Sequence, residues 1–216
     1  MFQNRQDAAL RLAHRLEKYR GEDGIVLAIP RGGVPIGYVI AQQLGFPLEV
    51  VLSKKIGHPN NSEYAIGSVS LDSVAVDERT AFGIPAEYIQ EQAARIQAKL
   101  RENFRLFMDG RPPTNLKGKT VIVVDDGIAT GHTMVATVEA IRKSRPAKLI
   151  VAVPVAPPHA QQQLAPLVDE FVCLLLPRDF AAVGQFYVTF DQVSDEEVIR
   201  LLRKSAAGAH GGAMAN

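Results

Sequence analysis

The stretch VIVVDDGIATGHTM, residues 121–134, joins an apolar run to two adjacent carboxylates, a loop rich in Gly and Thr, and a second apolar segment. A short, continuous apolar run is typical of a strand buried on both faces of a sheet. A loop between such a strand and a following helix presents free backbone N–H groups, and the helix dipole adds partial positive charge there. The loop is therefore expected to bind an anion.

The residues of this loop indicate which anion. Gly127 and Gly131 let the backbone approach a phosphate closely, and Thr130 and Thr133 add hydroxyl donors. The neighbouring acids, Asp125 and Asp126, cannot face the same phosphate, because carboxylates and phosphates both accept hydrogen bonds and neither donates one to the other. They suit the vicinal hydroxyls of a ribose, or a hydrated Mg²⁺. A phosphate on one side and a diol on the other predict a ribose 5-phosphate.

The rest of the chain alternates strand and helix patterns. Predicted strands cover residues 24–29, 48–52, 121–124, 149–155 and 171–176. Predicted helices are one capped by Asn4, those at 34–44, 87–108 and 133–143, a short one starting at Pro158, and a last one with a capping box of Ser194 and Glu197. Because parallel strands need crossover connections, this order predicts an α/β fold with a mostly parallel sheet flanked by helices. The polar segment 53–85 reads as a hairpin or excursion.

Composition narrows the class of protein. With 216 residues, 47% of them hydrophobic, and a net charge of +1, the chain fits one globular domain and lacks the basic stripe of a nucleic-acid binder. No run reaches the roughly 18 apolar residues of a membrane span, and the start of the chain is no signal peptide. A cytoplasmic protein with no membrane partner is expected. The only cysteine, Cys173, is expected to be buried and inert.

Ligands of parallel sheets bind outside the carboxyl ends of the strands. Four polar stretches follow predicted strands: PRGG (30–33), SKK (53–55), DDGIATG (125–131) and PRDF (177–180). These four stretches are therefore expected to meet at one edge of the sheet. A Walker A loop is excluded, because the spacing from Gly127 to Gly131 is one residue short and His132 replaces the lysine.

The motif VVDDGIATGHTM resembles the signature of type I phosphoribosyltransferases, which have a Rossmann-like core and a small hood or flap subdomain. The resemblance implies that the acid pair holds the ribose hydroxyls of 5-phosphoribosyl pyrophosphate (PRPP). It implies that the 5-phosphate lies on the loop formed by Gly127, Ile128, Ala129, Thr130, Gly131, His132 and Thr133. The pyrophosphate would meet Arg31, Gly32, Gly33, Lys54 and Lys55, with a cis peptide between Pro30 and Arg31.

The same resemblance divides the chain. It implies one phosphoribosyltransferase domain over 1–204, with a flap at 57–85, a hood at 176–193, and a flexible tail at 205–216. The hood, LPRDFAAVGQFY, would cover the base, and Glu63, Asp179 and Phe186 are the candidate base contacts. Phe186 and Tyr187 are, however, more typical of core packing than of a stacking platform. Ala129 departs from the 6-oxopurine enzymes, which have Asp at this position.

The implied reaction is transfer of the 5-phosphoribosyl group to a nitrogenous base with release of pyrophosphate. Arg31, Lys55, Asp125 and Asp126 are the candidate catalytic residues, and Mg²⁺ is the implied cofactor, held mainly by substrate oxygens with Asp179 within reach. Many relatives dimerise, which leaves a homodimer open. Two other classes stay open: a non-catalytic regulator that binds PRPP or a nucleotide, and a receiver-like domain phosphorylated on one of the acids.

Overall fold

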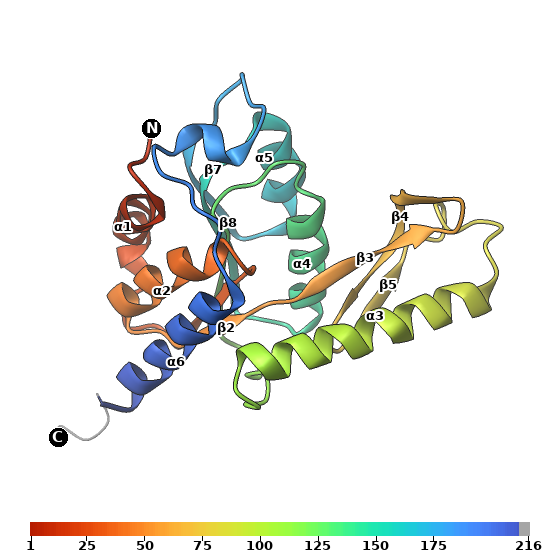
Figure 1. Ribbon diagram of the computed structural model, residues 1–216, viewed down its shortest axis with the longest axis horizontal. Coiled ribbons are helices and arrows are strands. Elements are labelled where there is room, and N and C mark those ends of the chain that lie inside the picture. Colours follow the sequence, from red (N-terminus) through yellow and green to blue (C-terminus); the bar gives the residue numbers. More distant parts are fainter. Residues whose placement is uncertain (212–216) are drawn as a thin grey trace.

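A computed structural model describes residues 1–211, except for the side chains of residues 63 and 209–211. At its centre lies a parallel sheet of five strands in the order β2–β1–β6–β7–β8 (Figure 1). These strands are β1 (Gly24–Ala28), β2 (Leu48–Val50), β6 (Thr120–Val124), β7 (Lys148–Val155) and β8 (Glu170–Leu175). The predicted α/β fold with a mostly parallel sheet is confirmed.

Helices cover both faces of this sheet. On one side lie α1 (Arg5–Leu16), α2 (Gly33–Leu44) and α6 (Asp195–Gly211), and on the other lie α4 (His132–Lys143) and α5 (Pro158–Leu164) (Figure 1). Because a strand sends alternate residues to opposite faces, neighbours such as Val123 and Val124 belong to different apolar cores. Both faces of the sheet are buried by apolar side chains, which explains why the strands read as continuous apolar runs rather than alternating ones.

An antiparallel arm projects from the edge of the core next to β2 (Figure 1). It consists of β3 (Ser53–His58), β4 (Asn61–Ser70) and β5 (Val74–Val76), in that order, and of the long helix α3 (Ala86–Phe107). The predicted excursion is thus a three-stranded sheet, and its buried side chains Ile56, Ile66 and Val69 pack in the same core cluster as residues of α3.

Three short 3₁₀ helices complete the described part of the chain: η1 (Glu17–Tyr19), η2 (Ala165–Leu167) and η3 (Val183–Phe186). The helix starts agree with the caps expected from sequence. The Asn4 side chain accepts the Asp7 N–H at 3.0 Å, and the Ser194 hydroxyl accepts the Glu197 N–H at 3.2 Å. Among residues 1–211 no helix is both long and apolar enough to cross a lipid bilayer.

Two expectations need correction. Residues 205–211 are not the flexible tail that was expected, because α6 continues through Gly211; residues 212–216 lie outside the description. Ala206 and Ala207 favour a helix, and a lone Gly208 costs only about 1 kcal/mol, too little to end one that is already formed. Cys173 is only partly buried; burial raises the pKa of its thiol to about 11.

Candidate active site

The loops that follow β1, β2, β6 and β8 leave the sheet at the same edge. All four strands run parallel within the five-stranded sheet, so their carboxyl ends point in one direction. The four polar stretches predicted to meet therefore do start from one edge. The arm begins there too, because β3 starts three residues after β2 ends.

The PRGG loop lies directly against the acid pair. The peptide between Pro30 and Arg31 is cis, as the resemblance implies. The Ile29 N–H donates to the Val124 carbonyl oxygen at 2.9 Å, which continues the pairing of β1 with β6 into the loops. A Cβ added at Gly32 would lie 1.9 Å from Asp126 Oδ2, and one at Gly33 would lie 2.7 Å from the Val124 oxygen. Only glycine permits so close a packing of the two loops.

The two carboxylates differ in their surroundings. Asp125 Oδ1 accepts the backbone N–H of Asp126 at 2.8 Å. Burial and the neighbouring charge of Asp126 raise the pKa of Asp125 well above its usual value. Burial also raises the pKa of Asp126, whereas the guanidinium of Arg5 acts in the opposite direction. The pair thus places two acids in a site where one negative charge is easier to hold than two.

Two residues that the sequence did not single out hold Asp126. Arg5, on the first turn of α1, contacts Asp126 Oδ2 through Nε at 2.9 Å and through Nη2 at 2.8 Å. The hydroxyl of Tyr187 donates to the Asp126 backbone oxygen at 2.6 Å. Tyr187 is buried and packs on the rings of Phe2 and Phe190, so the interpretation of Tyr187 as a packing residue is confirmed. No local sequence pattern could have revealed either contact.

The phosphate loop, residues 127–133, leads into α4. Ile128 anchors its first part: the Ile128 side chain is buried, and its N–H donates to the Val155 oxygen at 2.9 Å. Ala129 and Thr130 are exposed, and Gly131 turns the chain with a φ of 83° at the N-cap. The helical ladder starts with the bond from Val135 N–H to Gly131 O at 2.9 Å. The N–H groups just before that bond have no partner within the helix and can bind an anion.

The arm brings two cations to the end of this loop. Lys54 and Lys55 are exposed on β3, and they line a cavity of about 1080 Å³ together with His132 and Thr133 of α4. The hydroxyls of Ser53 and Thr137 lie 2.8 Å apart and join β3 to α4 beside this cavity. Asp125, Asp126 and Arg31 do not line it. The structure therefore brings the lysines to the phosphate loop but not into contact with the acid pair.

The remaining predicted residues lie further out. Arg31 donates from Nε to Asp195 Oδ1 at 2.6 Å, and both side chains are about half exposed. Asp179 is exposed, and Phe186 stacks on Phe180 with ring centroids 5.4 Å apart. Glu63 belongs to β4, but its side chain lies outside the description. The 176–193 segment covers the start of the phosphate loop, because a Cβ at Gly127 would lie 2.5 Å from Val183 Cγ1.

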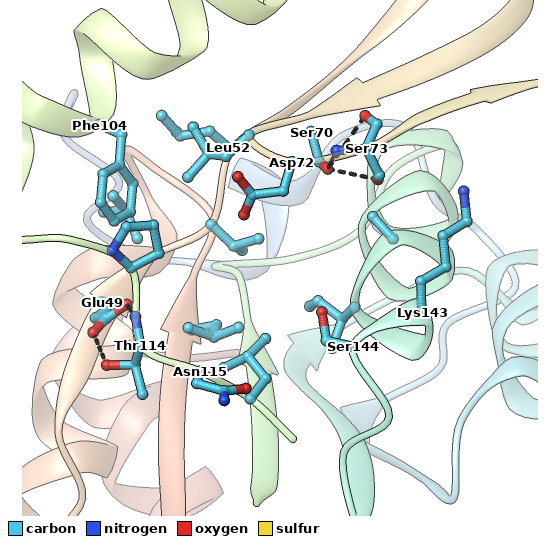
Figure 2. A pocket seen from close by; sticks show the side chains of 18 residues that line it. Glu49, Leu52, Ser70, Asp72, Ser73, Phe104, Thr114, Asn115, Lys143 and Ser144 are labelled. Atoms are coloured by element: carbon cyan, nitrogen blue, oxygen red, sulfur yellow. Dashed lines mark hydrogen bonds between the residues drawn. The ribbon is translucent and has the colours of Figure 1, made fainter. Parts of the chain in front are cut away.

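A second cavity, of about 600 Å³, lies where the arm joins the core (Figure 2). Its wall includes Glu49 of the edge strand β2, whose buried carboxylate accepts the Thr114 N–H at 3.1 Å and the Thr114 hydroxyl. Asp72 of the β4–β5 turn and Lys143 at the end of α4 also line it. None of the predicted site residues whose side chains are described lines this cavity.

Within the described part of the chain, no three His, Cys, Asp or Glu side chains are grouped so that they could hold a metal ion.

Comparison with known proteins adds to this geometry. A family model described as the phosphoribosyl transferase domain matches residues 3–190. Two Mycobacterium tuberculosis proteins, named as candidate phosphoribosyl transferases, are each 36% identical over 208 residues, which is 95% of this chain and 47% of each relative. This chain thus spans about half the length of those relatives.

Two further matches cover different parts of the chain. The bifunctional protein PyrR of Fusobacterium nucleatum is 35% identical over 101 residues, 46% of this chain and 55% of that protein. The crystal structure of a Thermus thermophilus protein is similar with a TM-score of 0.85 and 37% identity, over 94% of this chain and 98% of that one. The similarity to the Thermus thermophilus protein therefore extends over nearly the whole chain.

Proposed function

This chain belongs to the phosphoribosyl transferase family, and from this premise we propose that it transfers the 5-phosphoribosyl group of PRPP to a nitrogenous base. Such a reaction makes the protein a glycosyltransferase of the pentosyltransferase class, with a nucleotide and pyrophosphate as products. One observation carries the proposal: the acid pair 125–126 follows β6 at the carboxyl edge of a parallel sheet, and the loop after it leads into the N-terminal end of α4.

Each end of the ribose phosphate has a matching surface. The 5-phosphate would accept hydrogen bonds from the free N–H groups and hydroxyls of residues 129–133, where the dipole of α4 favours negative charge. Asp125 and Asp126 would accept the two ribose hydroxyls. The raised pKa of Asp125 bears on how two acids can lie side by side, because a proton on Asp125 removes the repulsion within the pair.

The leaving group would be bound on the other side. Gly32 and Gly33 bring backbone close to the acid pair, and Arg31, Lys54 and Lys55 supply positive charge as the bond from C1′ to pyrophosphate breaks. Arg31 would exchange its contact with Asp195 for the pyrophosphate. When bound, Mg²⁺ neutralises part of the pyrophosphate charge, and PRPP oxygens, with Asp179 within reach, would be its ligands.

The acceptor base would enter under the hood, residues 176–193, with the flap, residues 57–85, closing from the arm and excluding water from the cation-like ribose. A base nitrogen forms the new bond to C1′ and loses its proton. Ala129 has no group to receive that proton, so Glu63 and Asp179 are the candidates, and Phe186 is the candidate stacking contact. A homodimer remains part of the proposal.

Ala129 also motivates a second candidate, a regulator that binds PRPP or a nucleotide without transferring the sugar. The experiment that separates the two titrates PRPP with Mg²⁺ and then measures pyrophosphate release with a panel of purines and pyrimidines. If the protein transfers the sugar, it should bind PRPP and release pyrophosphate only when one particular base is present. Asp126→Asn should abolish both, whereas Asp109→Asn, an exposed acid paired with Arg203, should change neither. PRPP binding without pyrophosphate release in the presence of any of the bases would favour the regulator.

A further inference from the structure

Asp126 is held by residues from both ends of the chain. Phe2 forms a parallel bridge with Tyr187, in which the Phe2 N–H donates to Phe186 O and the Val188 N–H donates to Phe2 O, each at 2.8 Å. This bridge places the N-terminal segment beside the hood. Each of the two bridged segments contributes one side chain, Arg5 or Tyr187, that contacts Asp126.

Arg5 makes the contact with the carboxylate. Its Nε and Nη2 both reach Oδ2 of Asp126, its Nη1 donates to the Asp191 carbonyl oxygen at 2.7 Å, and its guanidinium lies 4.0 Å from the centre of the Phe190 ring. The side chains of Arg5 and Asp126 are only 13% and 14% exposed. A guanidinium fixed from three sides leaves the carboxylate a single orientation, and it engages only one of the two carboxylate oxygens.

Tyr187 makes the contact with the backbone. Its hydroxyl donates to the Asp126 oxygen at 2.6 Å, while its ring packs between those of Phe2 and Phe190. The peptide that follows Asp126 opens the phosphate loop. Tyr187 therefore fixes the backbone at the point where the ribose end of the site passes into the phosphate end.

We propose that Arg5 and Tyr187 are positioning residues, which hold the Asp126 carboxylate and backbone in the arrangement that receives a ribose hydroxyl. The inference rests on the proposed function, since it assumes that Asp126 meets the ribose. The charge of Arg5 has a second effect, because it opposes the rise in the pKa of Asp126 that burial causes. An ionised carboxylate is the better acceptor for a hydroxyl.

Two small ligands test the inference. Ribose 5-phosphate needs both the acid pair and the phosphate loop, whereas inorganic phosphate needs the loop alone. Arg5→Ala should weaken ribose 5-phosphate binding by about tenfold or more, as expected for one charge-assisted hydrogen bond, and should leave phosphate binding unchanged. Arg5→Lys keeps the charge but loses the fork of N–H donors and the ring contact, so it should recover only part of the affinity. Tyr187→Phe keeps the ring packing and should give a smaller loss, again confined to ribose 5-phosphate.

Arg11→Ala is the matched control. Arg11 is also on α1, also pairs with a carboxylate, that of Asp7 at 2.9 Å, and also lies over an aromatic ring, that of Phe2 at 5.5 Å, but it is half exposed and away from the site. This variant should bind ribose 5-phosphate like the wild type. Calorimetric titration gives the affinities, and thermal unfolding shows whether each variant is folded. If Arg5→Ala does not fold, Arg5→Lys and Tyr187→Phe carry the test.

Three outcomes overturn the inference. The first is that Arg5→Ala and Tyr187→Phe bind ribose 5-phosphate as tightly as Arg11→Ala does. Asp126 would then need no support from either residue. An equal loss for ribose 5-phosphate and phosphate shows that these residues only stabilise the loop. No binding of ribose 5-phosphate by the wild type removes the proposed function as well, and this failure is visible before any variant is made.

Discussion

The hydroxyl of Ser53, the first residue of β3, lies 2.8 Å from the hydroxyl of Thr137 on α4. Thr137 in turn donates to the Thr133 carbonyl oxygen at 2.8 Å. The base of the arm is thus joined to the helix that follows the phosphate loop. The two lysines after Ser53 are therefore set at a defined place relative to that loop, and their contribution to ligand binding can be separated from that of the loop.

Replacement of Lys54 by Ala should weaken PRPP binding by about tenfold, the usual effect of one charged donor, and should leave ribose 5-phosphate binding nearly unchanged. The reason is that only PRPP carries the pyrophosphate that Lys54 is proposed to meet. Lys99→Ala is the control, because Lys99 lies on α3 of the same arm and is exposed beside Glu102. Equal weakening of both ligands by Lys54→Ala would assign the lysine to the 5-phosphate instead.

Gly32→Ala should damage the acid pair. The added Cβ would lie 1.9 Å from Asp126 Oδ2, so either the PRGG loop or the carboxylate must move. Overpacking of this kind costs about 1–3 kcal/mol, and ribose 5-phosphate binding should fall with it. Gly208→Ala, where an added Cβ meets nothing within 4 Å, should instead stabilise α6 by up to about 1 kcal/mol. Thermal unfolding and a ribose 5-phosphate titration measure both. A Gly32→Ala protein as stable and as tight in binding as the wild type would contradict the packing argument.

The sequence predicted the part of this site that lies within one continuous stretch. An apolar run ended by two acids fixes β6 to within one residue, and the following Gly and Thr residues locate the start of α4. The contacts of Arg5 and Tyr187 with Asp126 were not predicted, because these residues lie 121 and 61 residues from Asp126 along the chain and meet it only through tertiary packing. Nothing in the local pattern of either residue signals such a contact.

The arm was harder to predict for a different reason. A shift in register between Ile56 and Gly57 interrupts the alternation of apolar and polar residues, and β5 has only three residues. Periodicity identifies a strand only when one face stays buried over several residues. The pattern therefore predicts only a hairpin or an excursion, and neither the three strands nor their packing on α3 follows from it.

Glu49→Gln should destabilise the junction between the arm and the core. The buried carboxylate accepts both the N–H and the hydroxyl of Thr114, and a glutamine offers only one oxygen to these two donors (Figure 2). One buried donor would lose its acceptor, at a cost of about 1–3 kcal/mol. Urea unfolding measures this cost. Glu139→Gln, at an exposed position of α4, serves as the control and should be neutral; equal stability of the two variants would mean that the Thr114 contacts contribute nothing.

Asp125→Asn should stabilise the fold while it abolishes ribose binding. Burial and the Asp126 charge raise the pKa of Asp125 in the folded chain above its value in the unfolded chain, so the folded chain holds this proton more tightly. The stability that this proton contributes is complete below about pH 4, near the unfolded pKa, and is lost as pH rises through the folded pKa. Asparagine carries no charge and keeps an oxygen for the Asp126 N–H. The variant should therefore gain on the order of 1 kcal/mol over the wild type at pH 8, and this gain should shrink towards pH 4.

Asp169→Asn should show the opposite dependence on pH. Although its partial burial acts to raise the pKa of Asp169, hydrogen bonds from the Leu149 N–H at 2.7 Å and from Arg142 at 2.9 Å lower it overall. The stability that the ionised Asp169 contributes is present above the unfolded pKa and lost as pH falls through the folded pKa. Urea unfolding at pH 4, 6 and 8 gives the difference in free energy of unfolding between each variant and the wild type. Plotted against pH, this difference should have slopes of opposite sign for the two variants. Parallel slopes would show that Asp125 is ionised at no cost in the folded chain, and the stabilisation expected from asparagine would have no cause.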